Sequence, residues 1–257
     1  MPGTGGDTAR EALRERHDRA ATDVRAAGRA GDGPALLDAT RRLQQVLDAA
    51  RRELGPGDVD TLVVEGSLAV AHLLGYDEQR GLEAAERNLA AREALLGADH
   101  PASLAAADAV AAAHRVTGRP EEAVRRHEDV VTRRARVLGD GHPCTIASRA
   151  ALALARADAG DVRGAAGLLA ATLDSAERLL GPAHAVAADV RELLAECRAA
   201  LPGDEPPGGA AAEPADPPEP ETGLLPRVPD PRARTRPLFF DRPSGPLPAV
   251  LVPPPAR

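Results

Sequence analysis

Apolar residues recur along the chain at a fixed interval. Leu68, Val110, Leu152 and Leu194 are each 42 residues apart, and a second apolar column shares this interval. The apolar positions suit stripes along helices, on which side chains three and four residues apart lie on one face. The pattern therefore predicts a series of amphipathic helices that repeats in register.

The dipeptide Leu-Gly is the clearest mark of the repeat. It occurs at residues 54–55, 96–97, 138–139 and 180–181, so three successive intervals of 42 residues pass without an insertion or deletion. Each unit opens with a polar turn, in which Gly can end one helix and Pro can begin the next. A helix of about four turns, a Gly turn and a helix of about five turns would complete the unit.

Columns of small residues indicate where these helices cross. One column contains Ala39, Gly81, Ala123 and Ala165, whose side chains are small enough to let two backbones approach closely. One helix pair cannot bury its apolar face alone, so neighbouring pairs must stack into a continuous core. The predicted fold is an all-α solenoid of antiparallel helix pairs.

The repeat also sets the predicted boundaries. We expect helix pairs at about 8–54, 61–96, 103–138 and 145–180, and a capping helix near 186–200. Thr8 and Glu11 have the spacing of a capping box at the start of this array. The array would then cover residues 8–201, after a disordered segment at 1–7. Residues 202–257 are rich in Pro, which predicts a disordered or polyproline-like tail.

Composition supports this interpretation and limits the function. The chain is 43% hydrophobic but only 1% aromatic, so its apolar residues are mostly the helix formers Ala and Leu, with Val. A net charge of −7 gives no indication of a basic surface for nucleic acid or an anionic membrane. Neither a signal peptide nor a long apolar run is visible, and Cys144 and Cys197 suggest no disulfide or metal framework. We expect a soluble cytoplasmic protein of bacterial origin.

Candidate chemistry is sparse. His100, His142 and His184 share one column, which raises the possibility of a metal site. However, residues one repeat apart would lie roughly 20 Å from one another, too far to bind one ion, so a role in the turn and helix start is favoured. His72 and His114 share another column, either as a pH-sensitive groove edge or as ordinary half-buried residues. No catalytic or phosphate-binding motif appears, which predicts no enzyme activity, cofactor or metal.

Two adjacent units carry a family resemblance. Residues 138–146 read Leu-Gly-Asp-Gly-His-Pro-Cys-Thr-Ile, residues 96–101 read Leu-Gly-Ala-Asp-His-Pro, and residues 118–123 form a Gly-x-x-Glu-Glu-Ala turn. This resembles tetratricopeptide repeats of the kinesin-light-chain type, in the version found in bacterial proteins. The resemblance spans about residues 34–200. Members of the family often clamp a bound peptide with Asn residues on the first helix of each unit, and residues 63–65, 105–107 and 147–149 lack them.

The resemblance implies a binding face. In the family the first helices of the units line a concave surface, and transfer by register gives a mildly apolar trough suited to an apolar peptide or helix. The alternative is that some of these columns only pack helices together. The implied residues are Val63, Gly66, Val70, Leu73, Ala105, Asp108, Ala112, Arg115, Val116, Ala147, Ala150, Leu154 and Ala157.

These observations predict a non-catalytic scaffold or adaptor for a protein or peptide partner. The alternative is a stand-alone sensor arm that acts in trans on an ATPase or a transcription regulator, since bacterial arrays of this type are often fused to such domains. Within the tail, Leu238, Phe239 and Phe240 hold the largest apolar side chains of an otherwise polar segment. They either dock in the trough of their own chain or a neighbour, or remain unattached.

Overall fold

The computed structural model describes residues 4–75 and 77–201, and this part of the chain consists of helices and short turns. The predicted tail at 202–257 lies outside the described residues. The helices are α1 (Thr4–Ala30), α2 (Gly33–Glu53), α3 (Val59–Leu74), α4 (Glu78–Leu96), α5 (Pro101–Val116), α6 (Pro120–Leu138), α7 (Pro143–Asp158), α8 (Val162–Leu180) and α9 (Ala185–Ala199).

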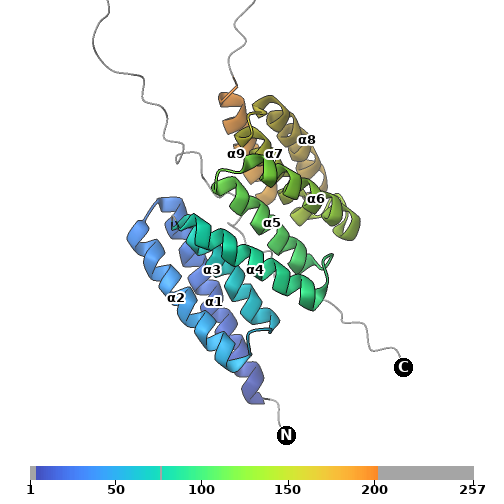
Figure 1. Cartoon of the computed structure of the whole chain (residues 1–257). Helices are drawn as coiled ribbons and strands as arrows, with labels where there is room; N and C mark the ends of the chain where they lie inside the picture. The colour runs from blue at the N-terminus through green and yellow to red at the C-terminus, as the bar shows by residue number, and fades with distance from the viewer. Residues whose placement is uncertain (1–3, 76, 202–257) are drawn as a thin grey trace, which may run out of the picture.

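The helices form a curved, two-layered solenoid (Figure 1). Each helix packs against the next along the chain, and the odd-numbered helices α1, α3, α5, α7 and α9 also contact one another in order. Among the described residues, the even-numbered helices make no such contacts with one another. The odd-numbered helices are therefore the closely spaced inner layer and line the concave side, as the register predicted, and the even-numbered helices form the convex side.

Local signals explain where the helices end. At Leu-Gly, the glycines Gly97, Gly139 and Gly181 adopt φ values of 87°, 91° and 92°, a region that favours glycine, and each lies immediately after an even-numbered helix. The hydroxyl groups of Thr61 and Thr145 donate to the carbonyl oxygens of the Leu-Gly glycines six residues earlier, at 2.8 and 2.9 Å. Each turn is thereby fixed to the helix that follows it.

The repeated histidines cap helices. Nδ1 of His100, His142 and His184 accepts a hydrogen bond from the backbone N–H two residues later, at 3.1 Å in each case, and Asp58 takes the same role at the start of α3. This confirms the helix-start interpretation of the column. Within the described residues, no group of three or more His, Cys, Asp or Glu side chains is placed to hold a metal ion.

The first helix differs from the prediction. α1 begins at Thr4, so Thr8 lies inside the helix and the predicted capping box is wrong. Arg10 instead binds Asp58 at 2.9 Å and Asp60 at 2.6 Å, which fastens the first turns of α1 to the start of α3. These contacts come from residues about 50 positions away, and a local motif carries no sign of them.

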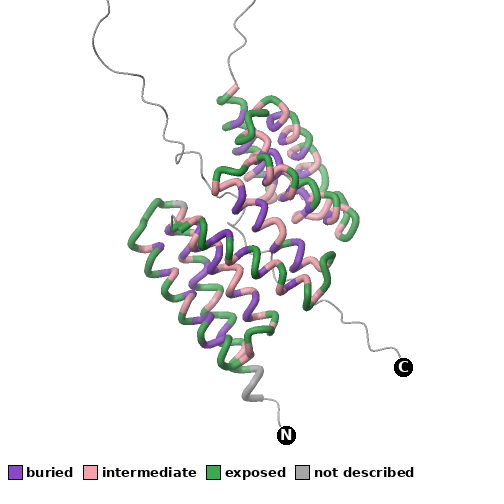
Figure 2. Tube along the Cα trace, in the orientation of Figure 1, coloured by how far each residue is buried: buried purple, intermediate pink, exposed green. Residues whose placement is uncertain are grey.

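The buried residues that form the apolar core lie between the two layers (Figure 2). Small residues permit the predicted close crossings of the helices. A Cβ at Gly81 would lie 2.6 Å from Cγ of Leu73, so only glycine lets α4 cross α3 at this distance. The equivalent Ala39, Ala123 and Ala165 are fully buried. Buried apolar clusters join α1 to α3, α3 to α5 and α7 to α9, and the junction of α5, α6 and α7 buries the polar side chains of His127, Arg134 and Ser148 as well as apolar ones.

Candidate partner-binding face

A stripe of small apolar residues forms the concave face. On α5 it comprises Ala105, Ala109, Ala112 and Val116, which are exposed or half-buried while the other faces of the helix pack against α4 and α6. Their spacing of three and four residues keeps them on one side of the helix. We call this stripe, with its register equivalents on α3, α7 and α9, the trough.

Several residues predicted for this face do not present an open side chain. Leu73 is 6% exposed and Ala150 is fully buried, so both belong to the packing between helices. Asp108 is held in a polar network described below, so it is not an open groove residue. The side chain of Arg115 is only 8% exposed and pairs with Asp158. Nine residues keep a partly or fully exposed position: Val63, Gly66, Val70, Ala105, Ala112, Val116, Ala147, Leu154 and Ala157.

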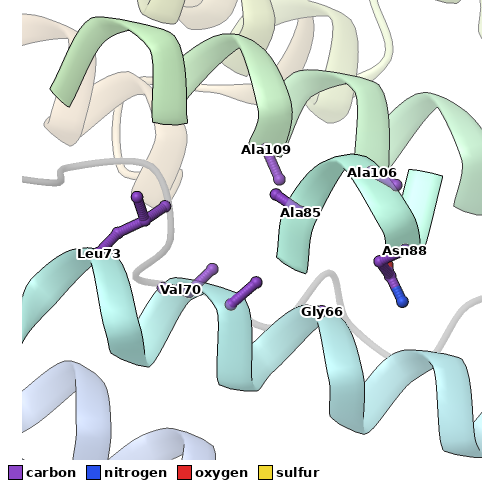
Figure 3. Close-up of a pocket in the computed structure, with 8 residues that line it drawn as sticks. Gly66, Val70, Leu73, Ala85, Asn88, Ala106 and Ala109 are labelled. Carbon is purple, nitrogen blue, oxygen red and sulfur yellow. The ribbon is translucent and has the colours of Figure 1, made fainter. Parts of the chain in front are cut away.

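A notch opens in the trough between α3 and α5 (Figure 3). Its volume of about 10 Å³ corresponds to one water molecule. Asn88 supplies its one polar side chain and donates through Nδ2 to the carbonyl oxygen of Leu62 at 2.7 Å. The notch can therefore receive a methyl-sized group but not an aromatic ring. Its lining residues are Gly66, Ala69, Val70, Leu73, Ala85, Asn88, Ala106 and Ala109.

The notch exists because one layer of the repeat uses small residues where the next layers use larger ones. Between α3 and α5 the three facing positions hold Gly66, Ala85 and Ala106. The same positions one repeat later hold Asp108, His127 and Ser148, whose side chains bond to one another. A further repeat on, they hold Ala150, Leu169 and Val190, all fully buried. The sequence repeats in register while the chemistry of this position changes from layer to layer.

Asp108 is the centre of the polar layer. Its carboxylate accepts from Nδ1 of His127 at 2.9 Å, Nη1 of Arg134 at 2.9 Å and the hydroxyl of Ser148 at 3.0 Å. Burial alone would raise the pKa of Asp108, but Arg134, His127 and Ser148 together lower it to about 2. Arg134 also donates to the carbonyl oxygen of Cys144 at 3.0 Å, so the network ties α5, α6 and α7 together.

Arg92 is the register equivalent of Arg134, but among the described residues it forms no ion pair with an acidic side chain. It is 9% exposed and donates to the carbonyl oxygens of Leu62 at 2.9 Å and Ala102 at 3.0 Å. Burial lowers the pKa of Arg92, and Glu65 opposes this effect. Arg92 and Arg134 make the same contact, because each donates to a carbonyl oxygen at the start of the next odd-numbered helix. Both residues thus fasten one repeat to the following one.

Comparison with known proteins agrees with this geometry. A family model described as a tetratricopeptide repeat matches residues 103–143 and 145–185. A solved structure of a putative kinesin light chain with nearly identical TPR-like repeats, from Podosopora anserina, is 27% identical, covers 73% of this chain and 85% of that chain, and gives a TM-score of 0.56. The structure of a variant of that protein is 26% identical, covers 73% of this chain and 93% of that chain, and gives a TM-score of 0.55. No curated protein sequence matches the chain.

Two units of the array, at residues 103–143 and 145–185, match the tetratricopeptide-repeat model, and the array is similar to solved repeats of the kinesin-light-chain-like type. This confirms the family resemblance that the Leu-Gly and His-Pro marks carried. The described residues contain no helix that is both long and apolar enough to cross a lipid bilayer.

The convex side of the array contains a second hollow, of about 390 Å³, between α4 and α6. Ala107 forms its floor, where the neighbouring layers carry the longer side chains of Glu65 and Arg149. The charges around it satisfy one another: Glu122 pairs with Arg126 at 2.7 Å, and other residues of α6 form similar pairs. This self-paired rim leaves little for a partner to bind.

Sequence reasoning missed the buried polar residues Asn88, Arg92, His127 and Arg134. The surrounding charges favour an outer helix face for Arg134, whereas it is 6% exposed and inside the array. One signal was available, because Arg92 and Arg134 are 42 residues apart and so share a column. An arginine that recurs in register among apolar columns indicates a repeated structural contact.

Proposed function

We propose that this protein is a non-catalytic scaffold that binds a protein or peptide partner in the trough, as an adaptor in the bacterial cytoplasm. The observation that carries the proposal is the contrast between the two sides of the array. Half-exposed Val70, Ala112, Val116 and Leu154 continue the concave stripe over three helices. On the convex side, the exposed apolar residues Leu95, Val137 and Leu179 lie singly near the ends of α4, α6 and α8, and charges pair with one another on α6. Exposed apolar surface that continues across repeats is typical of a protein-interaction face.

The trough suits an apolar ligand. It lacks the Asn residues with which related arrays clamp a peptide backbone, so side-chain packing against small residues must supply the affinity. The notch adds one place where a small aliphatic group can insert between α3 and α5. The tail segment Leu238–Phe240 is one candidate ligand within the chain, and an external protein is another.

Affinity capture from a bacterial lysate with full-length variants tests this proposal. We expect Leu154→Glu and Ala105→Glu to lose the captured partner, because each places a charge in the apolar trough. Ala105 is exposed, so its substitution leaves the core intact. The matched control is Leu179→Glu, at a residue that is 53% exposed near the end of α8. The proposal is wrong if both trough variants keep every partner, or if Leu179→Glu loses the same proteins.

A further inference from the structure

The trough changes character along its length. Across α3 and α5 its stripe is apolar, with Val63, Val70 and Val116 among its members, apart from Ser67, whose hydroxyl bonds to His17 at 2.8 Å. At the last two odd-numbered helices, the register positions of Val116 and Ala105 hold Asp158 and Asp189. Glu196 takes the position of Ala112 in the same way and is exposed on α9.

Acidic side chains gather at this end of the trough. Asp158 pairs with Nη1 of Arg115 at 2.8 Å, and the side chain of Arg115 is only 8% exposed. Glu192 lies on α9 beside Asp189 and Glu196 and adds a further negative charge. Because Arg115 matches the charge of Asp158, the acidic surplus lies on α9, and the trough is bipartite: it is apolar over α3 and α5 and acidic over α9.

One segment of the chain has the complementary order of residues. Arg232, Arg234 and Arg236 alternate along the sequence and are followed by Pro237 and then Leu238–Phe240. Alternate residues of an extended chain point to the same side, so the three arginines can face one surface together. The segment is basic first and apolar second, and it contains both phenylalanines of the protein. It lies outside the described residues.

Chain length permits the contact. Residue 232 follows Leu201 by 31 residues, which can span at most about 100 Å, far more than the width of two helix layers. Successive odd-numbered helices contact one another directly, so one repeat advances the inner layer by less than the roughly 20 Å expected from the sequence. Packed helices lie 8–10 Å apart, so the stripes of α5 and α9, two repeats apart, are separated by roughly 20 Å. Extended, the five residues from Arg234 to Phe239 cover about 17 Å. The two halves of the segment thus match the two halves of the trough in spacing as well as in chemistry.

We propose that residues 232–240 dock in the trough of their own chain, with the arginines on the acidic end and Leu238–Phe240 on the apolar end. This rests on the proposed function of the trough as a binding face. The phenylalanine rings lie on the stripe of α5 and not in the notch, which is too small for them. The bound tail blocks the trough, so an external partner must displace it.

A tryptophan reporter tests the docking in the full-length protein. The chain contains no Trp, so Phe239→Trp gives emission from one known position. We expect its emission maximum at shorter wavelength than that of Leu247→Trp, which places the same reporter in the tail beyond the segment. Val116→Glu at the apolar end, or the pair Asp189→Arg and Glu196→Arg at the acidic end, should move the emission to that of an exposed indole. Molar salt should do so in part, because it screens the ion pairs.

A charge exchange separates a direct contact from a general effect on the fold. When Arg234→Glu and Arg236→Glu are added to the variant that carries Asp189→Arg and Glu196→Arg, the short-wavelength emission should return. The control Glu121→Arg reverses an exposed charge on α6 and should leave the emission unchanged. An exposed reporter in the unaltered array, a failed restoration, or emission that depends on protein concentration and so indicates a second copy would each overturn the proposal. If the tail does not dock but Leu154→Glu still loses captured partners, the scaffold function is supported and the docking proposal is wrong. If docking holds and every partner is retained, the scaffold function falls.

Discussion

At the scale of single residues, the buried charges show how a repeat protein tolerates variation. Arg92 and Arg134 occupy one register position, and each donates to a carbonyl at the start of the next odd-numbered helix. Arg134 also has the carboxylate of Asp108, whereas Arg92 has Gly66 at the equivalent place. A buried cation bonded only to carbonyls is costly, since its charge is not neutralised. The layer that contains Arg92 therefore has a notch, whereas in the layer that contains Arg134 the Asp108 network fills this space and joins α5, α6 and α7.

Asp108→Asn tests this assignment at the residue scale. The amide leaves Arg134 buried without a counter-charge, and we expect the free energy of unfolding to fall by roughly 3 kcal/mol, the usual cost of breaking a buried pair. Urea denaturation at neutral pH measures the change. The matched control is Asp99→Asn, because Asp99 is half exposed while it pairs with Arg133 and Arg136, and such a surface pair contributes far less to stability than a buried one. Equal losses in the two variants would contradict a special role for the Asp108 network.

At the scale of helices and turns, the capping column gives a second prediction. His142→Ala removes the acceptor for the N–H of Cys144 and should lower the free energy of unfolding by about 1 kcal/mol. His142→Asp should retain most of the stability, because Asp58 caps α3 through the same backbone position. Thermal denaturation of both variants decides the matter. If the alanine and aspartate variants are equally destabilised, the histidine acts through packing and not through its cap.

These elements were largely predictable because their signals are local. The Leu-Gly and Pro marks predicted units at 61–96, 103–138 and 145–180, and the structure has α3–α4, α5–α6 and α7–α8 within two residues of these bounds. The binding face was harder to predict. Leu73 and Ala150 have the right spacing but turn into the core, since neighbouring faces of a helix differ by little in sequence. The partners of Arg134 could not be predicted, because Asp108 and Ser148 lie on two other helices.

At the scale of the whole molecule, several histidines make the array sensitive to mild acid. Burial lowers the pKa of His17, His72, His114 and His142 below the ordinary value. His114 is 4% exposed, its ring nitrogens make no hydrogen bond within the described part of the chain, and the nearest carboxylate, Glu86, is 3.8 Å away. Arg126 and Arg119 also lower the pKa of His114, while Glu122 and Glu86 oppose them. The folded array thus keeps these rings neutral where the unfolded chain would protonate them.

The unfolding free energy should therefore fall as the pH is lowered from about 7 toward 5. A histidine whose pKa is lower in the folded state than the unfolded value of about 6.5 binds fewer protons when folded, so acid favours the unfolded chain. Urea midpoints at pH 7.5 and 5.0 measure this loss. In His114→Gln one such group is absent, and the difference between the two midpoints should be smaller than in the unaltered protein. Because glutamine is similar in size and always neutral, an unchanged difference would mean that His114 is protonated as easily in the folded array as in the unfolded chain.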